Sequence, residues 1–160
     1  MLNSIQHLLR NVKINNTYIG YGSKGIEKKR NQEVQDKNAE SVSKSNYTER
    51  SVSKSKAVYK NESWDLVDKV KEDENAVAKI KREDLPKELQ NKSTEEIKIF
   101  VEKKADERIE IQKEITVLAK KRQEFIDIES KKTKTQDDLG NAISNSIVTI
   151  AKTKGYTVEN

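Results

Sequence analysis

The chain has 160 residues, of which 32% are hydrophobic and 37% are charged, and 32 basic against 27 acidic residues give a net charge of +5. The absence of cysteine excludes disulfides and thiolate metal sites, and a single histidine, His7, excludes multi-histidine metal sites. Leu, Ile, Val and Phe make up about 23% of the chain, just above the roughly 20% below which a highly charged chain is disordered. We therefore expect one domain at most, with a small core, no enzymatic activity and no cofactor or metal.

The composition divides the chain into three segments: residues 1–22, 23–56 and 57–160. The first segment combines a short helix with short strands or extended loop at Val12–Ile14 and Tyr18–Tyr21. The second is a polar helix or linker whose few apolar residues follow no steady period. Because an apolar face that packs supplies most helical stability, we expect the second segment to be marginal helix or partly disordered. The third segment is the helical region.

The helical region begins with a cluster of apolar residues: Trp64, Leu66, Val67 and Val70. Ser63 is the expected N-cap of their helix, with Asp65 in its first turn. Trp64 is the only tryptophan, and it is either the centre of a small core or an exposed docking residue. Pro86 disfavours helix at the residue before it, so a helix boundary is predicted at Leu85.

The strongest pattern starts at Ser93, which forms a capping-box motif with Glu96. Neither Gly nor Pro interrupts residues 93–130, which predicts one helix about 57 Å long. Its apolar residues follow at steps of mostly three or four: Ile97, Val101, Ala105, Ile111, Ile115, Leu118 and Phe125. Arg108 and Arg122 fill two gaps in this stripe. A compact globule of this size is only about 40 Å across, so we expect an elongated, coiled-coil-like molecule or a partner for this helix.

A last amphipathic helix follows the polar linker 131–136. It begins at the acidic residues Asp137 and Asp138, and Gly155 ends it as the C′ residue. One face carries Leu139, Ile143, Ile147 and Ile150. The linker is short enough for the helix to fold back antiparallel on its predecessor. We predict a helical hairpin in which Ile143 and Ile147 face Leu118 and Phe125.

Two motifs have a plain structural interpretation. Residues 20–25 match the dinucleotide-binding pattern G-x-G-x-x-G, but no hydrophobic second strand follows, so we expect a glycine-rich turn. The basic run 28–30, with Tyr18 and Tyr21 nearby, has the residue types that contact phosphates and stack on bases. Acidic residues interleave with the basic runs and limit counterion release, so we do not expect nucleic acid as the main partner. His7 lacks the rigid scaffold that a catalytic base needs.

Several motifs occur in one order over roughly residues 12–158. They are Asn15–Gly22 (NNTYIGYG), Gln35–Ala39 (QDKNA), Ala57–Leu66 (AVYKNESWDL), Asp84–Glu88 (DLPKE), Val101–Arg108 (VEKKADER) and Ile111–Lys113 (IQK). Together they resemble the region that follows the von Willebrand factor type A domain in bacterial secreted proteins. The D-x-S-x-S metal-binding motif of a type A domain is absent from this chain. The resemblance therefore implies neither metal binding nor adhesion for any residue here.

The resemblance implies a non-enzymatic, all-α spacer or docking tail in a secreted or cell-envelope protein. Its partner would be another protein or the remainder of a longer chain. A free-standing chain is expected to be cytoplasmic, because we find neither a secretory signal nor an apolar run long enough to span a membrane. The alternative is a small basic helical protein that binds nucleic acid weakly.

Overall fold

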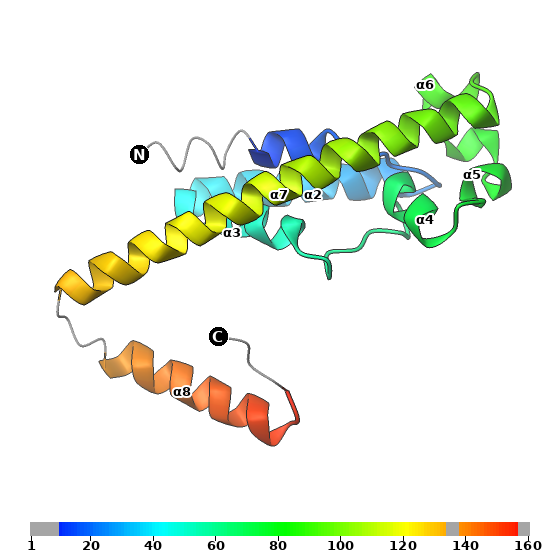
Figure 1. The fold of residues 1–160 in the computed structure, drawn as a ribbon. Coiled ribbons are helices and arrows are strands. Elements are labelled where there is room, and N and C mark those ends of the chain that lie inside the picture. Colours follow the sequence, from blue (N-terminus) through cyan, green and yellow to red (C-terminus); the bar gives the residue numbers. More distant parts are fainter. Residues whose placement is uncertain (1–9, 134–137, 157–160) are drawn as a thin grey trace. The chain divides into compact units, whose positions relative to one another are not determined.

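The computed structural model describes residues 10–133 and 138–156, and this part of the chain is all-α, as the sequence predicts (Figure 1). No strand forms within it, although Gly20 and Asp65 make an isolated antiparallel bridge. The chain divides into two compact units, one ending at Arg122 and the other beginning at Gln123. Helix α7 runs through this boundary. His7, Asp137 and the linker residues 134–136 lie outside the described residues.

The first unit starts with residues 10–15 in helical conformation. The helices that follow are α2 (Gly25–Val42), α3 (Lys44–Ser55), α4 (Leu66–Glu72), α5 (Ala76–Lys79), the 3₁₀ helix η1 (Arg82–Asp84) and α6 (Lys87–Gln90). The strand alternative for Val12–Ile14 is wrong, because Asn11 and Ile14 are buried at helical spacing while Val12 between them is exposed. Residues 18–21 are extended loop.

Residues 23–56 are helical, which is one of the two alternatives that the sequence left open. Ser43 separates α2 from α3, and its hydroxyl oxygen accepts a hydrogen bond of 3.0 Å from the backbone N–H of Asn46. The buried residues of the two helices are mostly polar: Gln32, Asp36, Tyr47, Thr48, Ser51 and Lys54. Buried polar residues, with the ion pair of Lys54 and Asp36 among them, thus replace the apolar face that the sequence lacks.

The helix boundaries after residue 60 follow local signals, with one correction. The N-cap of α4 is Asp65, whose side chain accepts a 3.1 Å hydrogen bond from the N–H of Asp68. The predicted cap, Ser63, is wrong because the chain is still in a turn there. The boundary at Leu85 is confirmed, since η1 ends at Asp84 and α6 begins after Pro86.

Two hydrophobic clusters pack along α7 (Thr94–Thr133) within the first unit. The larger consists of Ile19, Leu66, Val67, Val77, Leu85, Leu89, Ile97 and Val101. The smaller consists of Ile14, Tyr18, Trp64 and Ile115. The rings of Trp64 and Tyr18 lie 5.6 Å apart, and Trp64 is only 7% exposed. Trp64 is therefore a core residue, and the docking alternative for it is wrong.

The capping box at the start of α7 is confirmed. The N–H of Ser93 donates to the Glu96 carboxylate at 2.7 Å, and the N–H of Glu96 donates to the Ser93 hydroxyl at 3.2 Å. The helix has 40 residues and is about 60 Å long. Its stripe is buried only up to Ile115, and beyond Arg122 the apolar residues Phe125, Ile126 and Ile128 are exposed.

Helix α8 (Asp138–Thr153) ends as the sequence predicts. Gly155 has a φ of +81°, its N–H bonds to the carbonyl of Lys152, and the N–H of Tyr156 bonds to that of Ala151. These two bonds make a Schellman motif. Ile143, Ile147 and Ile150 are more than half exposed, and the side chain of Leu139 lies outside the description. The pairing of Ile143 and Ile147 with Leu118 and Phe125 stays a prediction.

Candidate functional site

A buried arginine joins three segments of the first unit. Arg108, in the middle of α7, is 5% exposed. Its guanidinium donates to both the hydroxyl and the carbonyl oxygen of Thr17 at 2.9 Å. It also donates to Asp65 at 2.7 Å and Asp68 at 2.8 Å, and it stacks 4.2 Å from the ring centre of Tyr18. We call these five residues the Arg108 cluster.

Asp65 also connects the Arg108 cluster to the loop before α2, in addition to the bonds between Arg108 and Thr17. This residue is fully buried, and one carboxylate oxygen accepts a hydrogen bond of 2.7 Å from the N–H of Ile19. The other oxygen binds Arg108 and caps α4. Both carboxylate oxygens of Asp65 are therefore used inside the fold, so neither is available to a substrate.

The opposite charges in the Arg108 cluster favour each other's ionised forms. Burial alone would lower the pKa of Arg108, but Asp65 and Asp68 raise it above its ordinary value. Burial raises the pKa of Asp68, and Arg108 only partly opposes this. Burial also raises the pKa of Tyr18 well above its ordinary value. The pKa of Asp68 therefore moves toward neutral pH, but this carboxylate is bound to Arg108 inside the fold, whereas acid–base catalysis needs a group that a substrate can reach.

A second polar cluster lies where α2, α3 and the first helical segment meet. Lys54 is 1% exposed, and its ammonium group donates to Asn11 at 3.0 Å, to Asn15 at 2.8 Å and to Asp36. Asp36 also accepts hydrogen bonds of 2.7 Å from Asn15 and from Arg50. We call these residues the Lys54 cluster. It ties two helices of the polar second segment to the helix before them.

In the Lys54 cluster, the pKa values of Lys54 and Asp36 are both lowered, for different reasons. Burial lowers the pKa of Lys54 to about 8, although Asp36 opposes this. Burial alone would raise the pKa of Asp36, but hydrogen bonds from Asn15, Lys54 and Arg50 together lower it. A lysine with a lowered pKa is a potential nucleophile, but nucleophilic chemistry also needs access. Lys54 is enclosed, so we assign it a structural role.

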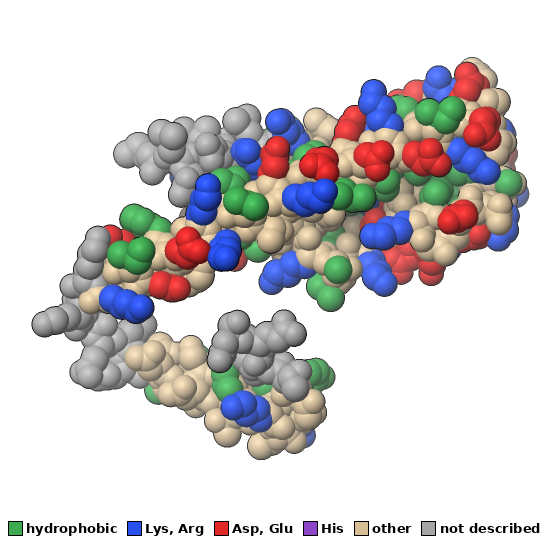
Figure 2. Space-filling view, viewed as in Figure 1, with side chains coloured by type: hydrophobic (Ala, Val, Ile, Leu, Met, Phe, Trp, Pro, Cys, Tyr) green, Lys and Arg blue, Asp and Glu red, His purple; other side chains and the backbone are tan. Residues whose placement is uncertain are grey.

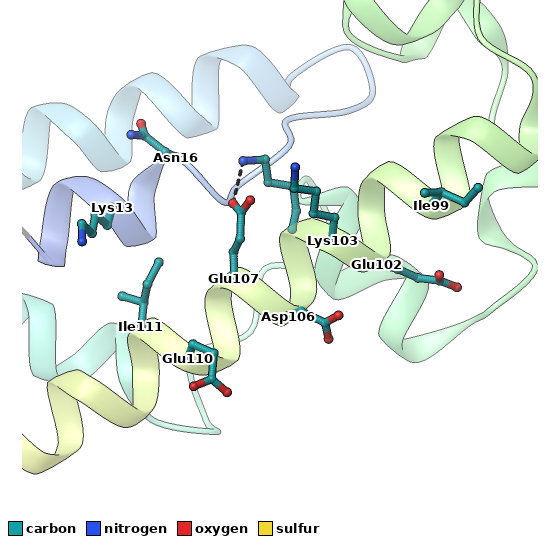
Figure 3. A pocket seen from close by; sticks show the side chains of 10 residues that line it. Lys13, Asn16, Ile99, Glu102, Lys103, Asp106, Glu107, Glu110 and Ile111 are labelled. Carbon is teal, nitrogen blue, oxygen red and sulfur yellow. Dashed lines mark hydrogen bonds and ion pairs between the residues drawn. The ribbon is translucent and has the colours of Figure 1, made fainter.

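A groove of about 850 Å³ lies beside α7 in the first unit. It is lined by Lys13, Asn16, Ile99, Glu102, Lys103, Lys104, Asp106, Glu107, Glu110 and Ile111. Lys104 and Glu107 pair at 2.7 Å, whereas the carboxylates of Glu102, Asp106 and Glu110 lie along one side of α7 and point away from Lys13 and Asn16 (Figure 3). A ligand site needs polar groups that converge on one point. This groove lacks such a set.

Residues 20–25 form the glycine-rich turn that the sequence predicts. Gly22 has a φ of +75°, and its N–H donates to the carbonyl of Asp84 at 2.8 Å. A Cβ atom on Gly20 would lie 2.8 Å from the carbonyl oxygen of Gly25, so the two backbones need this close approach. Close packing of the turn therefore explains the glycines.

The basic run 28–30 lies on α2, but the two tyrosines near it are not free to stack on nucleic-acid bases. Lys29 donates to the carbonyl of Tyr18 at 2.9 Å, and the ring of Tyr18 is buried in the Arg108 cluster. The hydroxyl of Tyr21 donates to the carbonyl of Glu62. Neither tyrosine is placed to stack on a base. Acidic and basic side chains also alternate over the visible face of the first unit (Figure 2).

Exposed apolar side chains gather in the second unit. Phe125, Ile126 and Ile128 lie on the end of α7. Ile143, Ile147 and Ile150 share one side of α8, whose visible face carries few charges (Figure 2). We call these three isoleucines the α8 face. Exposed apolar groups that lie together on one element mark interaction surfaces. The α8 face is the best candidate functional site in the described part of the chain.

The structure separates the residues predicted to pack or interact into three groups. Trp64, Leu66, Val67, Ile97, Val101 and Ile115 are buried; Ile111 and Leu118 are half-buried; Phe125, Ile143 and Ile147 are exposed. The sequence analysis missed the partners of Arg108 and the whole Lys54 cluster. One signal was present for the first, because Arg108 occupies a stripe position where an apolar residue was expected.

Among the described residues, no group of three or more potential metal ligands occurs, and no helix is both long and apolar enough to cross a membrane. Comparison with known proteins found no matching family model, no matching curated protein and no matching solved structure.

Proposed function

We propose that this protein is a non-enzymatic docking tail or spacer, in which the first unit is a rigid support and the α8 face binds a protein partner. The supporting observation is the exposure of Ile143, Ile147 and Ile150, which are 51%, 61% and 61% exposed on one side of α8. Burial of an isoleucine side chain is worth about 1.5–3 kcal/mol, so a face of three gains substantially from a partner.

The internal chemistry of the first unit supports the same proposal. Its buried ionic groups bond to one another, and the groove beside α7 has no convergent set of polar groups. The resemblance to the region after a von Willebrand factor type A domain is part of the proposal. On that resemblance, we propose that the docking tail belongs to a secreted or cell-envelope protein of a bacterium.

Site-specific photo-crosslinking in the native host tests the docking role. A photoreactive amino acid at Ile147 should give a discrete adduct with one partner, and excess unlabelled wild-type chain should suppress it. The matched control is Val117, which is 54% exposed on α7 in the first unit and should give no discrete adduct. Equal labelling from Ile147 and Val117 would contradict a docking role for the α8 face.

A further inference from the structure

We propose that the occupant of the α8 face is a second copy of this chain, whose own α8 packs antiparallel against it. This inference rests on the proposed docking function and names the partner. The three isoleucines of α8 fall at positions 143, 147 and 150, with steps of four and three. This is the spacing of a coiled-coil seam, which packs against a second helix.

The charges of α8 favour an antiparallel copy. Asp138 begins the helix, Lys152 and Lys154 lie at its end, and residues 139–151 carry no charge at all. Two antiparallel copies bring the acidic start of each helix to the basic end of the other. Two parallel copies place like charges together, which is unfavourable. The antiparallel pair is also self-complementary, as a two-fold symmetric dimer requires.

The polar groups beside the α8 face keep their hydrogen bonds when a second helix covers them. The hydroxyls of Ser146 and Thr149 donate to the carbonyls of Ala142 and Asn145 at 2.8 and 2.7 Å. Because these donors are already satisfied by their own backbone, covering them leaves no unpaired hydrogen-bond donor. Ser146 and Ala151 are also small, which allows a close approach of the two helices.

Two other occupants fit less well. Helices that lie on a lipid surface usually carry Lys and Arg along their polar face, whereas the lysines of α8 are confined to its end. The exposed end of α7 presents Phe125 and Ile128 among Glu124, Asp127 and Glu129. Packing the uncharged α8 face there, as the predicted helical hairpin requires, would remove carboxylates from water, which is costly, so we propose the second copy in place of the hairpin.

The expected dimer is weak and reversible. A helix of 16 residues is about 24 Å long, so a pair buries less area than the roughly 1,200 Å² of a standard stable interface. We expect a dissociation constant of about 10–100 μM. Sedimentation velocity of the full chain, from below to above this range, should show the sedimentation coefficient rise with concentration.

Two matched variants locate the interface. Ile147→Asp should abolish the concentration dependence, and Val117→Asp, which adds the same charge on α7, should retain it. The urea midpoint seen by Trp64 fluorescence should be unchanged for Ile147→Asp, because Trp64 reports only the first unit. A wild-type chain that stays monomeric at every concentration would overturn the proposal, and so would equal effects of the two variants.

A charge exchange tests the orientation. Asp138→Lys should weaken the dimer about tenfold, because lysines then face lysines at both ends of an antiparallel pair. Mixing this variant with Lys152→Asp/Lys154→Asp should restore association as a heterodimer. An undiminished Asp138→Lys dimer would exclude the antiparallel arrangement and overturn the proposal as stated.

Binding to lipid vesicles and photo-crosslinking distinguish the second copy from two other possible occupants of the α8 face, a lipid surface and a different protein. Neutral phosphatidylcholine vesicles should not bind the chain; binding that Ile147→Asp abolishes would overturn the proposal in favour of a lipid surface. A monomeric chain that still gives a discrete crosslink from Ile147 to a different protein would refute the second copy but leave the docking function intact.

Discussion

Arg108 is the residue on which the first unit depends most. Its side chain connects α7 to residues that lie 91 and 43 positions earlier in the chain, and it neutralises two carboxylates that are largely removed from water. A buried ion pair that loses one partner leaves an uncompensated charge, which is more costly than the loss of the contact itself.

We therefore predict that Arg108→Met lowers the free energy of unfolding by about 3–5 kcal/mol. Arg122→Met is the matched control, since Arg122 also interrupts the α7 stripe but pairs with the exposed Glu49 at 2.6 Å. That loss should be about 0–1 kcal/mol. Urea unfolding followed by Trp64 fluorescence measures both, and equal losses would show that the Arg108 cluster does not hold the fold together.

Lys54 makes stability depend on pH in a direction opposite to that of an ordinary ion-paired lysine. Its pKa is about 8 in the folded chain and near 10.5 in the unfolded chain. Between these values the unfolded chain binds more protons, so the contribution of Lys54 to stability rises with pH and is lost as the pH falls toward 8.

The stability difference between wild type and Lys54→Met should therefore grow from pH 8 to pH 10. The tyrosines titrate in both proteins and largely cancel from this difference. Lys56→Met, at an exposed lysine just after α3, should track the wild type over the same range. A difference for Lys54→Met that shrinks as the pH rises would mean that ion pairing with Asp36 outweighs burial.

At the scale of elements, the helices with local signals are the ones that can be predicted from the sequence. The capping box at Ser93, the boundary at Leu85 and the glycine that ends α8 involve residues within a few positions of one another. Helices α2 and α3 carry no comparable signal. Their interior depends on Lys54 and Asp36, 18 residues apart, whose pairing no periodicity reveals.

The candidate site, too, could be predicted only as far as its signals are local in the sequence. The α8 face follows from helical spacing alone, and the sequence analysis named two of its three residues as interaction residues. What covers that face does not follow from spacing, because a stripe on one helix is compatible with its own chain, a second copy or another protein. The partners of Arg108 also required the tertiary fold, although its place in an apolar stripe marked it as unusual.

One element-scale prediction concerns the start of α7. Ser93→Ala removes the hydroxyl that accepts from the N–H of Glu96, and it should cost about 1 kcal/mol. Lys92→Ala, at the exposed neighbouring residue, should change stability by less than about 0.5 kcal/mol. Thermal unfolding followed by circular dichroism compares the two, and indistinguishable melting curves would contradict the capping assignment.

At the scale of the whole molecule, the proposed function gives the two units different roles. The first unit contains both hydrophobic clusters and both buried ionic clusters. The second unit adds exposed apolar residues that this fold does not use. Elongation, which the length of α7 led us to expect, stays a prediction. Small-angle scattering tests it, and a radius of gyration near 15 Å would contradict it.

The central claim is that the α8 face serves binding and is surplus to folding. Urea unfolding of the full chain carrying Ile143→Ser, Ile147→Ser and Ile150→Ser, measured in dilute solution by far-ultraviolet circular dichroism, which reports the helices of both units, tests it most directly. Our account predicts a free energy of unfolding within about 0.5 kcal/mol of the wild type, as for substitutions at exposed positions. A loss of about 2 kcal/mol or more, typical of substitutions in a core, would contradict it.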